Sequence, residues 1–136
     1  MPRIVLDTNI VLDVFVFADS AAVPLKAALE AGSLDWLATR PMRDELERVL
    51  DYPKIVQRLA LNQLMAEDVL AAFDKHARPV EVAAKASVTC SDADDQPFID
   101  LAVAHKALLL SKDKAVTSMK KRLLVLEVHT QVAINS

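Results

Sequence analysis

Two short apolar runs, one near each end of the chain, both lead into a carboxylate. Residues 4–6 run directly into Asp7, and residues 108–110 reach Asp113 after two intervening positions. Apolar runs of this length, bounded by polar residues, are typical of buried parallel strands. Ligands of open α/β sheets bind outside the carboxyl ends of the strands. We therefore expect Asp7 and Asp113 to share a site that is assembled from the two ends of the sequence.

Strand and helix signals alternate along the chain. The sequence predicts the remaining strands at residues 34–38, 79–82 and 123–128, and it extends the second apolar run to residues 107–111. It predicts helices at residues 8–18, at 20–31 with a stop at Gly32, from Pro41 onward, twice between Pro53 and Ala77, and at 95–106 after a loop at 83–94. Strands separated by helices imply right-handed crossovers. The pattern therefore predicts an α/β fold with a mostly parallel sheet.

Length and composition limit the fold and its partners. The 136 residues fit a single domain, residues 1–136, with one hydrophobic core. With 53% hydrophobic residues and one glycine, the chain is expected to be compact and rich in helix. The net charge of −3 provides no overall attraction for nucleic acid. A polyanion would have to be attracted by a local basic patch or by a bound metal ion.

The same composition bears on the compartment. The lone Cys90 excludes a disulfide within the chain, and no Cys/His group has the spacing of zinc ligands. Residues 1–3 lead directly into the first strand without the basic and apolar regions of a signal peptide. No apolar run approaches the roughly 20 residues of a membrane span. We expect a cytoplasmic protein that does not enter the membrane.

Acidic residues from four segments are expected near the carboxyl edge of the sheet. They are Asp7, Glu45 in the helix from Pro41, the cluster of Asp92, Asp94 and Asp95, and Asp113. Carboxylates this close repel and raise one another's pKa values unless a proton or a metal ion lies among them. Mg²⁺ and Mn²⁺ prefer carboxylate and water oxygens and often contact substrate phosphates. The pattern therefore favours a divalent-metal site for phosphodiester chemistry.

Each acid also has an ordinary structural interpretation. Asp7 is a good residue to cap the helix that follows it. Glu45 can form an ion pair with Arg48, three positions later on the same helix. The cluster at 92–95 can complement the dipole of the next helix. The convergence of all four segments on one edge favours the metal site over these separate explanations.

Four segments resemble the motifs of the PIN-domain ribonucleases. Residues 4–9, IVLDTN, are similar to the family's first strand and its Asp-Thr-Asn, and residues 39–50, TRPMRDELERVL, to the helix bearing its second acid. Residues 91–104, SDADDQPFIDLAVA, resemble the third motif, and residues 111–113, SKD, resemble the fourth. One such motif is weak evidence, but four in the right order carry weight. The resemblance spans essentially the whole chain.

This resemblance implies a fold, an activity and a set of site residues. The fold is a three-layer α/β/α sandwich, and the activity is Mg²⁺- or Mn²⁺-dependent hydrolysis of RNA that leaves a 5′-phosphate and a 3′-hydroxyl. The matching catalytic and metal-binding acids are Asp7, Glu45, Asp95 and Asp113, with Asp92 as a further metal ligand and Asp94 as an alternative. We expect Thr8, Asn9 and Ser111 to orient carboxylates or substrate through hydrogen bonds.

The resemblance also bears on partners. Within the family, the chain is most similar to bacterial PIN proteins that are toxins of toxin–antitoxin pairs, which implies an antitoxin partner and a homodimer. Basic residues flank the acids: Arg40 and Arg43 follow one predicted strand, and Lys112 and Lys114 follow another. They are either solvated charges, as most charge runs are, or two positive banks that guide RNA to the metal.

One departure from the family pattern follows Asp113. Members often carry a second acid there, whereas this chain continues with Lys114, Ala115 and Val116. One bound metal ion and two therefore stay open as alternatives. So does a PIN-like module for RNA or protein binding with little or no catalysis. A phosphotransfer enzyme with Asp7 as nucleophile is disfavoured, because Asn9 stands where a second Asp is needed.

Overall fold

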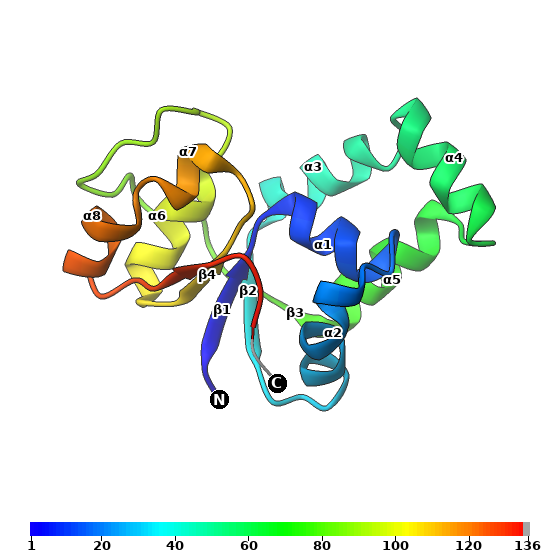
Figure 1. The fold of residues 1–136 in the computed structure, drawn as a ribbon, viewed down its shortest axis with the longest axis horizontal. Coiled ribbons are helices and arrows are strands. Elements are labelled where there is room, and N and C mark those ends of the chain that lie inside the picture. The colour runs from blue at the N-terminus through cyan, green and yellow to red at the C-terminus, as the bar shows by residue number, and fades with distance from the viewer. Residues whose placement is uncertain (135–136) are drawn as a thin grey trace.

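A computed structural model describes residues 1–134 and contains one sheet of five strands in the order β3-β2-β1-β4-β5 (Figure 1). The strands are β1 (Arg3–Leu6), β2 (Asp35–Ala38), β3 (Ala77–Pro79), β4 (Leu108–Leu110) and β5 (Thr130–Gln131). All four neighbouring pairs are parallel. The predicted parallel sheet is therefore confirmed, with β1 at its centre and β3 and β5 at its edges.

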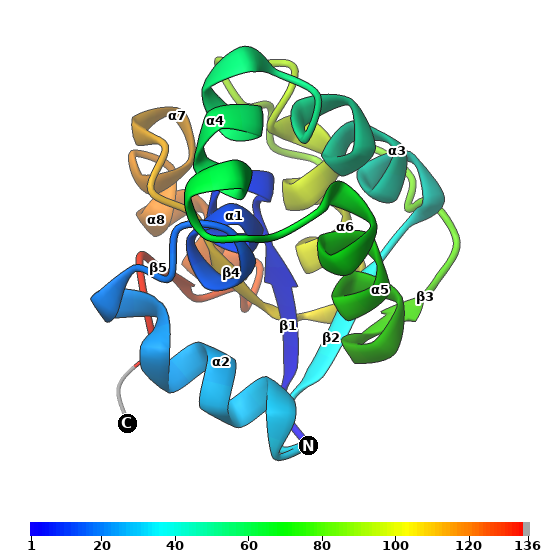
Figure 2. The same cartoon turned by 90° about the vertical axis from the view of Figure 1, so that its right-hand side faces the viewer.

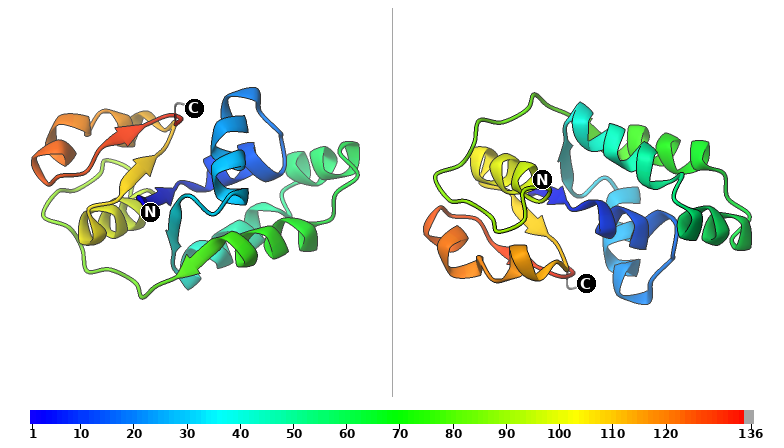
Figure 3. Two further views of the ribbon diagram at one scale, coloured as in Figure 1. Left: turned by 90° about the horizontal axis from the view of Figure 1, so that it is seen from below. Right: turned by 90° about the horizontal axis from the view of Figure 1, so that it is seen from above.

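Helices cover both faces of this sheet. One layer contains α1 (Thr8–Phe15), the 3₁₀ turn η1 (Ser20–Ala22), α2 (Val23–Glu30), α3 (Arg40–Val49), α4 (Pro53–Leu61) and α5 (Ala66–His76), and it faces the viewer in Figure 2. The other contains α6 (Gln96–His105), α7 (Lys114–Thr117) and α8 (Lys120–Val125) (Figure 3). No helix within residues 1–134 combines the length and apolar character needed to cross a membrane.

The change of layer follows from the strand order. From β1 the chain moves outward to β2 and β3, and it then returns past β1 to β4 and continues to β5. Right-handed crossovers that run in opposite directions along a sheet place their helices on opposite faces. The predicted three-layer α/β/α sandwich is therefore confirmed.

Burial explains the apolar runs. Ile4 and Val5 on β1 and Leu109 and Leu110 on β4 have no exposed surface, because helices cover both sides of these strands. On β2, Trp36 lies in edge-on contact with Phe73 of α5, with ring centroids 5.0 Å apart. The core is thus continuous from the sheet into the helical layers.

Helix ends follow ordinary start and stop residues. Pro41, Pro53 and Pro97 lie in the first turns of α3, α4 and α6, where a missing backbone N–H removes no helical hydrogen bond. Gly32 follows α2 with φ +69°, and its N–H donates to the carbonyl of Leu29 at 3.1 Å. This left-handed conformation is the usual way for glycine to end a helix, so the predicted stop is confirmed.

Several predicted boundaries are wrong. The strand predicted at 123–128 begins within α8, and the fifth strand is β5. Leu123 is buried whereas Leu124 and Val125 are both exposed, which departs from the alternation of a strand with one buried face. The third strand lies at 77–79, and the first helix ends at Phe15, three residues before Ala18 with its positive φ of 50°. The helices α7 and α8 were not predicted.

The predicted loop at 83–94 is confirmed and is longer than expected. Residues 80–95 contain neither helix nor strand. Loops of this length are uncommon within compact domains and are usually either functional or linkers. This segment crosses from the edge strand β3 to α6 and delivers the acidic cluster to the carboxyl edge of the sheet (Figure 1).

Candidate metal centre

The pairing of β1 with β4 brings the two ends of the chain together. Leu6 lies opposite Leu110, and the N–H of Asp7 donates to the Leu110 carbonyl at 3.0 Å. The chain therefore leaves both strands at the same level. There the hydroxyl of Ser111, which is fully buried, donates to Oδ2 of Asp7 at 2.8 Å and accepts the N–H of Asp113 at 3.1 Å. Ser111 thus links the first acid to the last.

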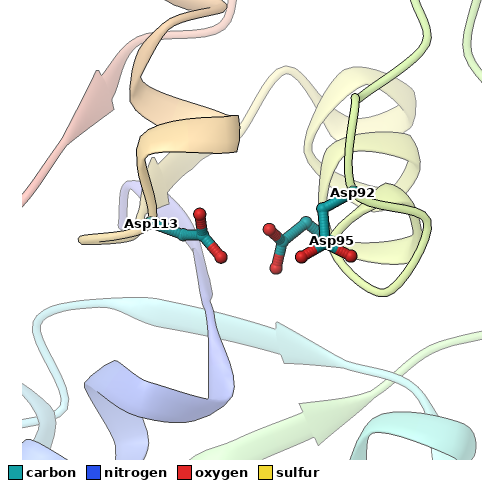
Figure 4. Close-up of side chains that lie close together, drawn as sticks. All are labelled: Asp92, Asp95 and Asp113. Carbon is teal, nitrogen blue, oxygen red and sulfur yellow. The ribbon is translucent and has the colours of Figure 1, made fainter.

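Three acids face one another at this edge. Asp113 begins α7, and Asp92 and Asp95 lie on the segment that leads into α6 (Figure 4). One carboxylate oxygen from each residue lies within 4.8 Å of the others. Oδ1 of Asp113 accepts the N–H of Ala115 at 2.9 Å, and Oδ1 of Asp92 accepts the N–H of Asp94 at 2.9 Å. These short contacts fix the orientation of two of the three carboxylates.

Glu45 joins the site through a neighbour of Asp7. It lies on α3 and is half-buried, and its Oε1 accepts the hydroxyl of Thr8 at 3.0 Å. Within residues 1–134, Glu45 forms no ion pair with Arg48 within 4.0 Å. The hydrogen bond holds Glu45 beside the start of α1, where Asp7 lies.

The carboxylates interact electrostatically across these segments. Burial raises the pKa of Asp95 to about 7, and the adjacent carboxyl group of Asp113 and the charges of Asp7 and Asp92 raise it further. Burial likewise raises the pKa of Asp7, against the lowering effect of the Ser111 hydroxyl, and the charge of Asp113 raises it further. Burial also raises the pKa of Glu45, where the charge of Asp7 adds to the shift.

Most carboxylate oxygens of the site are not used in helix-capping hydrogen bonds. Asp7 and Asp95 occupy the N-cap positions of α1 and α6, yet neither side chain makes a capping hydrogen bond. Asp113 caps α7 with one oxygen and keeps the other free of that role. Asp7, Asp95 and Asp113 therefore lie at helix starts, and most of their carboxylate oxygens make no capping hydrogen bond.

The donor set fits a hard divalent cation. Oδ2 of Asp95 is buried and has no hydrogen-bond partner among the described atoms. An unpartnered buried polar atom is costly unless a proton or an ion satisfies it. Carboxylate oxygens are also the donors that Mg²⁺ and Mn²⁺ prefer. The residues present therefore fit the ion that the sequence pattern suggests.

The residues predicted to orient the site fall into two groups. Thr8 and Ser111 both donate hydrogen bonds to acids of the site, as described above. Asn9 is exposed, and its side chain makes no hydrogen bond within residues 1–134. Asp94 is also exposed and enters the site only through its backbone N–H to Asp92 and its charge near Glu45.

The basic residues are already engaged in several cases. Arg40 pairs with Asp44 at 3.0 Å, and Arg43 makes two hydrogen bonds to Asp74 at 2.7 and 2.9 Å. Lys112 forms an ion pair with Asp13 of α1. Lys114 is exposed at the start of α7.

Asp13 is a buried acid that the sequence motifs do not single out. It is 8% exposed and anchors Lys112, so this lysine lies against α1 and ties the β4–α7 connection to that helix. The available signal was a single acid within the apolar stretch of residues 10–17. Such a residue is rarely buried without a partner of opposite charge.

We predict that the charge of Asp95 makes the metal-free protein less stable as the pH rises. The unfolded chain releases this proton near pH 3.8, whereas the folded protein retains it until about pH 7. Between these values the folded state binds more protons, so the free energy of unfolding falls with increasing pH. Asp95→Asn cannot ionise and should therefore melt at a higher temperature than the wild type in EDTA above pH 7, with a smaller advantage toward pH 4.

Asp51→Asn is the matched control, because Asp51 is an exposed carboxylate outside the site. Its melting temperature should follow that of the wild type at each pH. A series of thermal melts in EDTA across this pH range measures both variants. Parallel curves for Asp95→Asn and the wild type would contradict the prediction.

Comparisons with known proteins bear on the fold and on the family of the chain. No curated protein matches the chain significantly. Among solved structures, VapBC2 from Rickettsia felis, bound to a DNA fragment from their promoter, has a similar fold with a TM-score of 0.61 at 16% sequence identity. The match covers 94% of this chain and 98% of the other. The profile of the PIN domain matches residues 3–115, which include all the acids described above. The protein therefore belongs to the PIN domain family.

Proposed function

We propose that this PIN domain is a divalent-metal-dependent endoribonuclease. The observation that carries the proposal is the buried, unpartnered Oδ2 of Asp95 within a cluster that also contains Asp92 and Asp113. The raised pKa of Asp95 supports a site that is completed by a cation, because a divalent ion would compete with the proton it retains. RNA is the substrate class that the family resemblance implies.

The chain's residues divide the work at this site. Asp7, Glu45, Asp95 and Asp113, with Asp92 in support, would hold Mg²⁺ or Mn²⁺ directly or through water. When bound, the ion would supply a strong positive charge next to the phosphate and lower the pKa of a water for attack on phosphorus. That attack would leave a 5′-phosphate and a 3′-hydroxyl.

Hydrogen bonds would keep these carboxylates in place during the reaction. The Ser111 hydroxyl fixes one oxygen of Asp7, and the Thr8 hydroxyl fixes one oxygen of Glu45. Partners of this kind orient metal ligands and raise metal affinity. The proton held by Asp95 in the metal-free protein has to leave before this carboxylate binds an ion.

The basic residues near the edge are the proposed RNA contacts. Lys114 is the best placed, because it is exposed and follows Asp113 directly. Arg40 and Arg43 have surface carboxylates as partners, which RNA phosphates can replace at modest cost. Lys112 pairs with the buried Asp13, so its first contribution is to hold the β4–α7 connection.

The proposed partners are an antitoxin protein and a second copy of the chain. Exposed apolar side chains gather on α4 and its flanks: Tyr52 is 56% exposed, Val56 46%, Leu61 76% and Met65 65%. Contiguous apolar patches on a surface mark interaction sites, and we propose that these side chains form such a patch. The similar fold of VapBC2 from Rickettsia felis, bound to a DNA fragment from their promoter, is consistent with a toxin of a toxin–antitoxin pair.

A binding module without catalysis is the second candidate. It is favoured by Lys114, Ala115 and Val116, which follow Asp113 in place of a further acid. A site with fewer acids neutralises the charge of bound cations less well. Measurements of metal binding and of RNA cleavage therefore distinguish the two candidates. An inert module would bind RNA or protein and would gain no stability from a divalent ion.

We predict that Asp7→Asn abolishes cleavage of single-stranded RNA in Mn²⁺ while the fold is retained. The substitution removes a charge from the metal site but leaves an oxygen for the Ser111 hydroxyl. Loss of several kcal/mol of charge stabilisation corresponds to a rate reduction of at least about 100-fold. Gel assays of labelled RNA, with circular dichroism to check the fold, measure the effect.

Thermal melts supply the control for this experiment. Mn²⁺ should raise the melting temperature of the wild type and of Asp51→Asn, because a ligand of the folded state stabilises it, and should raise that of Asp7→Asn less. Full activity in Asp7→Asn would rule out the nuclease proposal. An unchanged melting temperature of the wild type in Mn²⁺ would favour the inert module.

We predict that Lys114→Ala mainly lowers RNA affinity, whereas Lys112→Ala mainly lowers the stability of the protein. Lys114→Ala should weaken RNA binding and reduce the dependence of the logarithm of affinity on that of salt by about 0.7, the loss of one phosphate contact on a single strand. Lys112→Ala leaves the buried Asp13 without its partner, so it should mainly lower the melting temperature. Fluorescence anisotropy across a salt series, beside thermal melts, distinguishes them.

Lys26→Ala on α2 is the control for a lost surface charge, and it should leave RNA affinity unchanged. Equal salt dependence in Lys114→Ala and Lys26→Ala would contradict the assignment of Lys114 to the RNA path.

We predict that the purified protein forms a dimer and also binds the product of a neighbouring reading frame. Light scattering should give twice the single-chain mass of 14.9 kDa. Tyr52→Ser and Val56→Ser should lower this mass if α4 lies in the interface. A single-chain mass at all concentrations, and no complex on co-expression, would contradict both partner proposals.

A further inference from the structure

The long loop before α6 is held by side chains of that helix. At Gln96, in its first turn, Oε1 accepts the N–H of Cys90 at 2.6 Å, and Nε2 donates to the Val88 carbonyl at 3.0 Å. The same Nε2 donates to Oδ1 of Asp100 at 2.8 Å. The Gln96 amide therefore holds both Val88 and Cys90, and Nζ of Lys85 adds a longer contact of 3.4 Å to the Val88 carbonyl.

Asp100 extends this contact by one helical turn. Its Oδ1 accepts both the Gln96 amide and the N–H of Ala86, each at 2.8 Å. Ala86 and Cys90 are 9% and 6% exposed, so both ends of this part of the loop are packed into the protein. Buried backbone groups without regular structure need such partners. We call Gln96 and Asp100 the α6 clamp.

The clamp acts on the segment that supplies two of the acids. Cys90 precedes Asp92 by two residues, and its Sγ donates to the Ala115 carbonyl at 3.4 Å. The N–H of Ala115 in turn donates to Oδ1 of Asp113 at 2.9 Å. Cys90 thus connects the loop that carries Asp92 to the short helix that Asp113 begins.

Asp100 has no direct place among the metal ligands. It lies outside the group of Asp92, Asp95 and Asp113, whose oxygens approach one another. Its Oδ1 is already shared by two donors. The Asp100 side chain contacts the loop backbone and Gln96. It can therefore act on the acids by positioning the loop, without contacting a metal ion itself.

We propose that the α6 clamp positions Asp92 and Asp95 against Asp113 and thereby sets the affinity of the site for its divalent ion. This inference rests on the proposed metal-dependent function. The acids repel one another in the metal-free protein, so a released loop would relax by carrying Asp92 away from Asp113. Binding an ion would then require the loop to be ordered again, which weakens affinity.

The test measures Mn²⁺ affinity directly, by electron paramagnetic resonance of the free ion. Gln96→Ala and Asp100→Ala should each weaken binding by about tenfold, the lower range for residues that support metal ligands. Asp100→Asn keeps an oxygen for the Ala86 N–H and the Gln96 amide, so it should bind Mn²⁺ nearly as the wild type does. Rescue by this neutral variant separates the hydrogen bonds from the charge of Asp100.

Asn62→Ala is the matched control. The Asn62 side chain also secures a backbone carbonyl, that of Val16 at 2.6 Å, but it lies outside the acidic edge. It should lose stability without losing Mn²⁺ affinity. Hydrogen exchange adds a readout without metal: the amides of Ala86, Cys90 and Asp94 should exchange faster in both alanine variants than in the wild type.

The outcomes distinguish this inference from the proposed function. If the wild type binds no Mn²⁺, the proposed function fails and the inference falls with it. If the wild type binds Mn²⁺ and both alanine variants bind it equally well, the inference alone is overturned. It is also overturned if Asn62→Ala weakens binding as much as they do, because general destabilisation would then explain the loss.

Discussion

The register between β1 and β4 is the constraint on which the site depends. Ile4 lies opposite Leu108 and Leu6 opposite Leu110, and these strands are buried on both faces. Their apolar residues therefore hold the register, since a slip would misplace them against the helical layers. Because the two strands are parallel and side by side, the residues that follow them emerge at one edge, and the Ser111 hydroxyl can reach Asp7.

The clustered carboxylates of the site lower the stability of the fold that supports them. Carboxylates are gathered where burial raises the pKa values of Asp7, Glu45 and Asp95. A chain selected only for stability would place neutral or oppositely charged groups there. The surrounding structure compensates with well-packed strands and with hydrogen bonds from Thr8, Ser111 and the α6 clamp. The buried apolar contacts thus lie in the sheet and the helices that cover it, and the repulsion between carboxylates is concentrated at the carboxyl edge.

Much of the fold and the choice of acids could be predicted from the sequence. Asp7 and Asp113 follow short apolar runs that are typical of buried strands, and Glu45 occupies a helix that begins at that same edge. These inferences rest on patterns of neighbouring residues, and the folded chain has the local structure that those patterns predict.

Other features depend on contacts that no local pattern reveals. An apolar run such as residues 123–126 suits a strand and a helix equally, so the last strand was misplaced. Lys112 is paired by Asp13, which lies far away in the sequence. The path of the long loop is set by the side chains of Gln96 and Asp100, and their spacing of four residues is common in any helix.

Pro79, in the edge strand β3, has a consequence for how the molecule associates. Proline has no N–H, so a strand added beside β3 would lack one hydrogen bond of its ladder. At the opposite edge, β5 has two residues, too few to template another strand. Both borders of the sheet thus discourage continuation into a neighbouring molecule. Specific assembly would have to use the helical layers, and uncontrolled assembly through the sheet is suppressed by the same two strands.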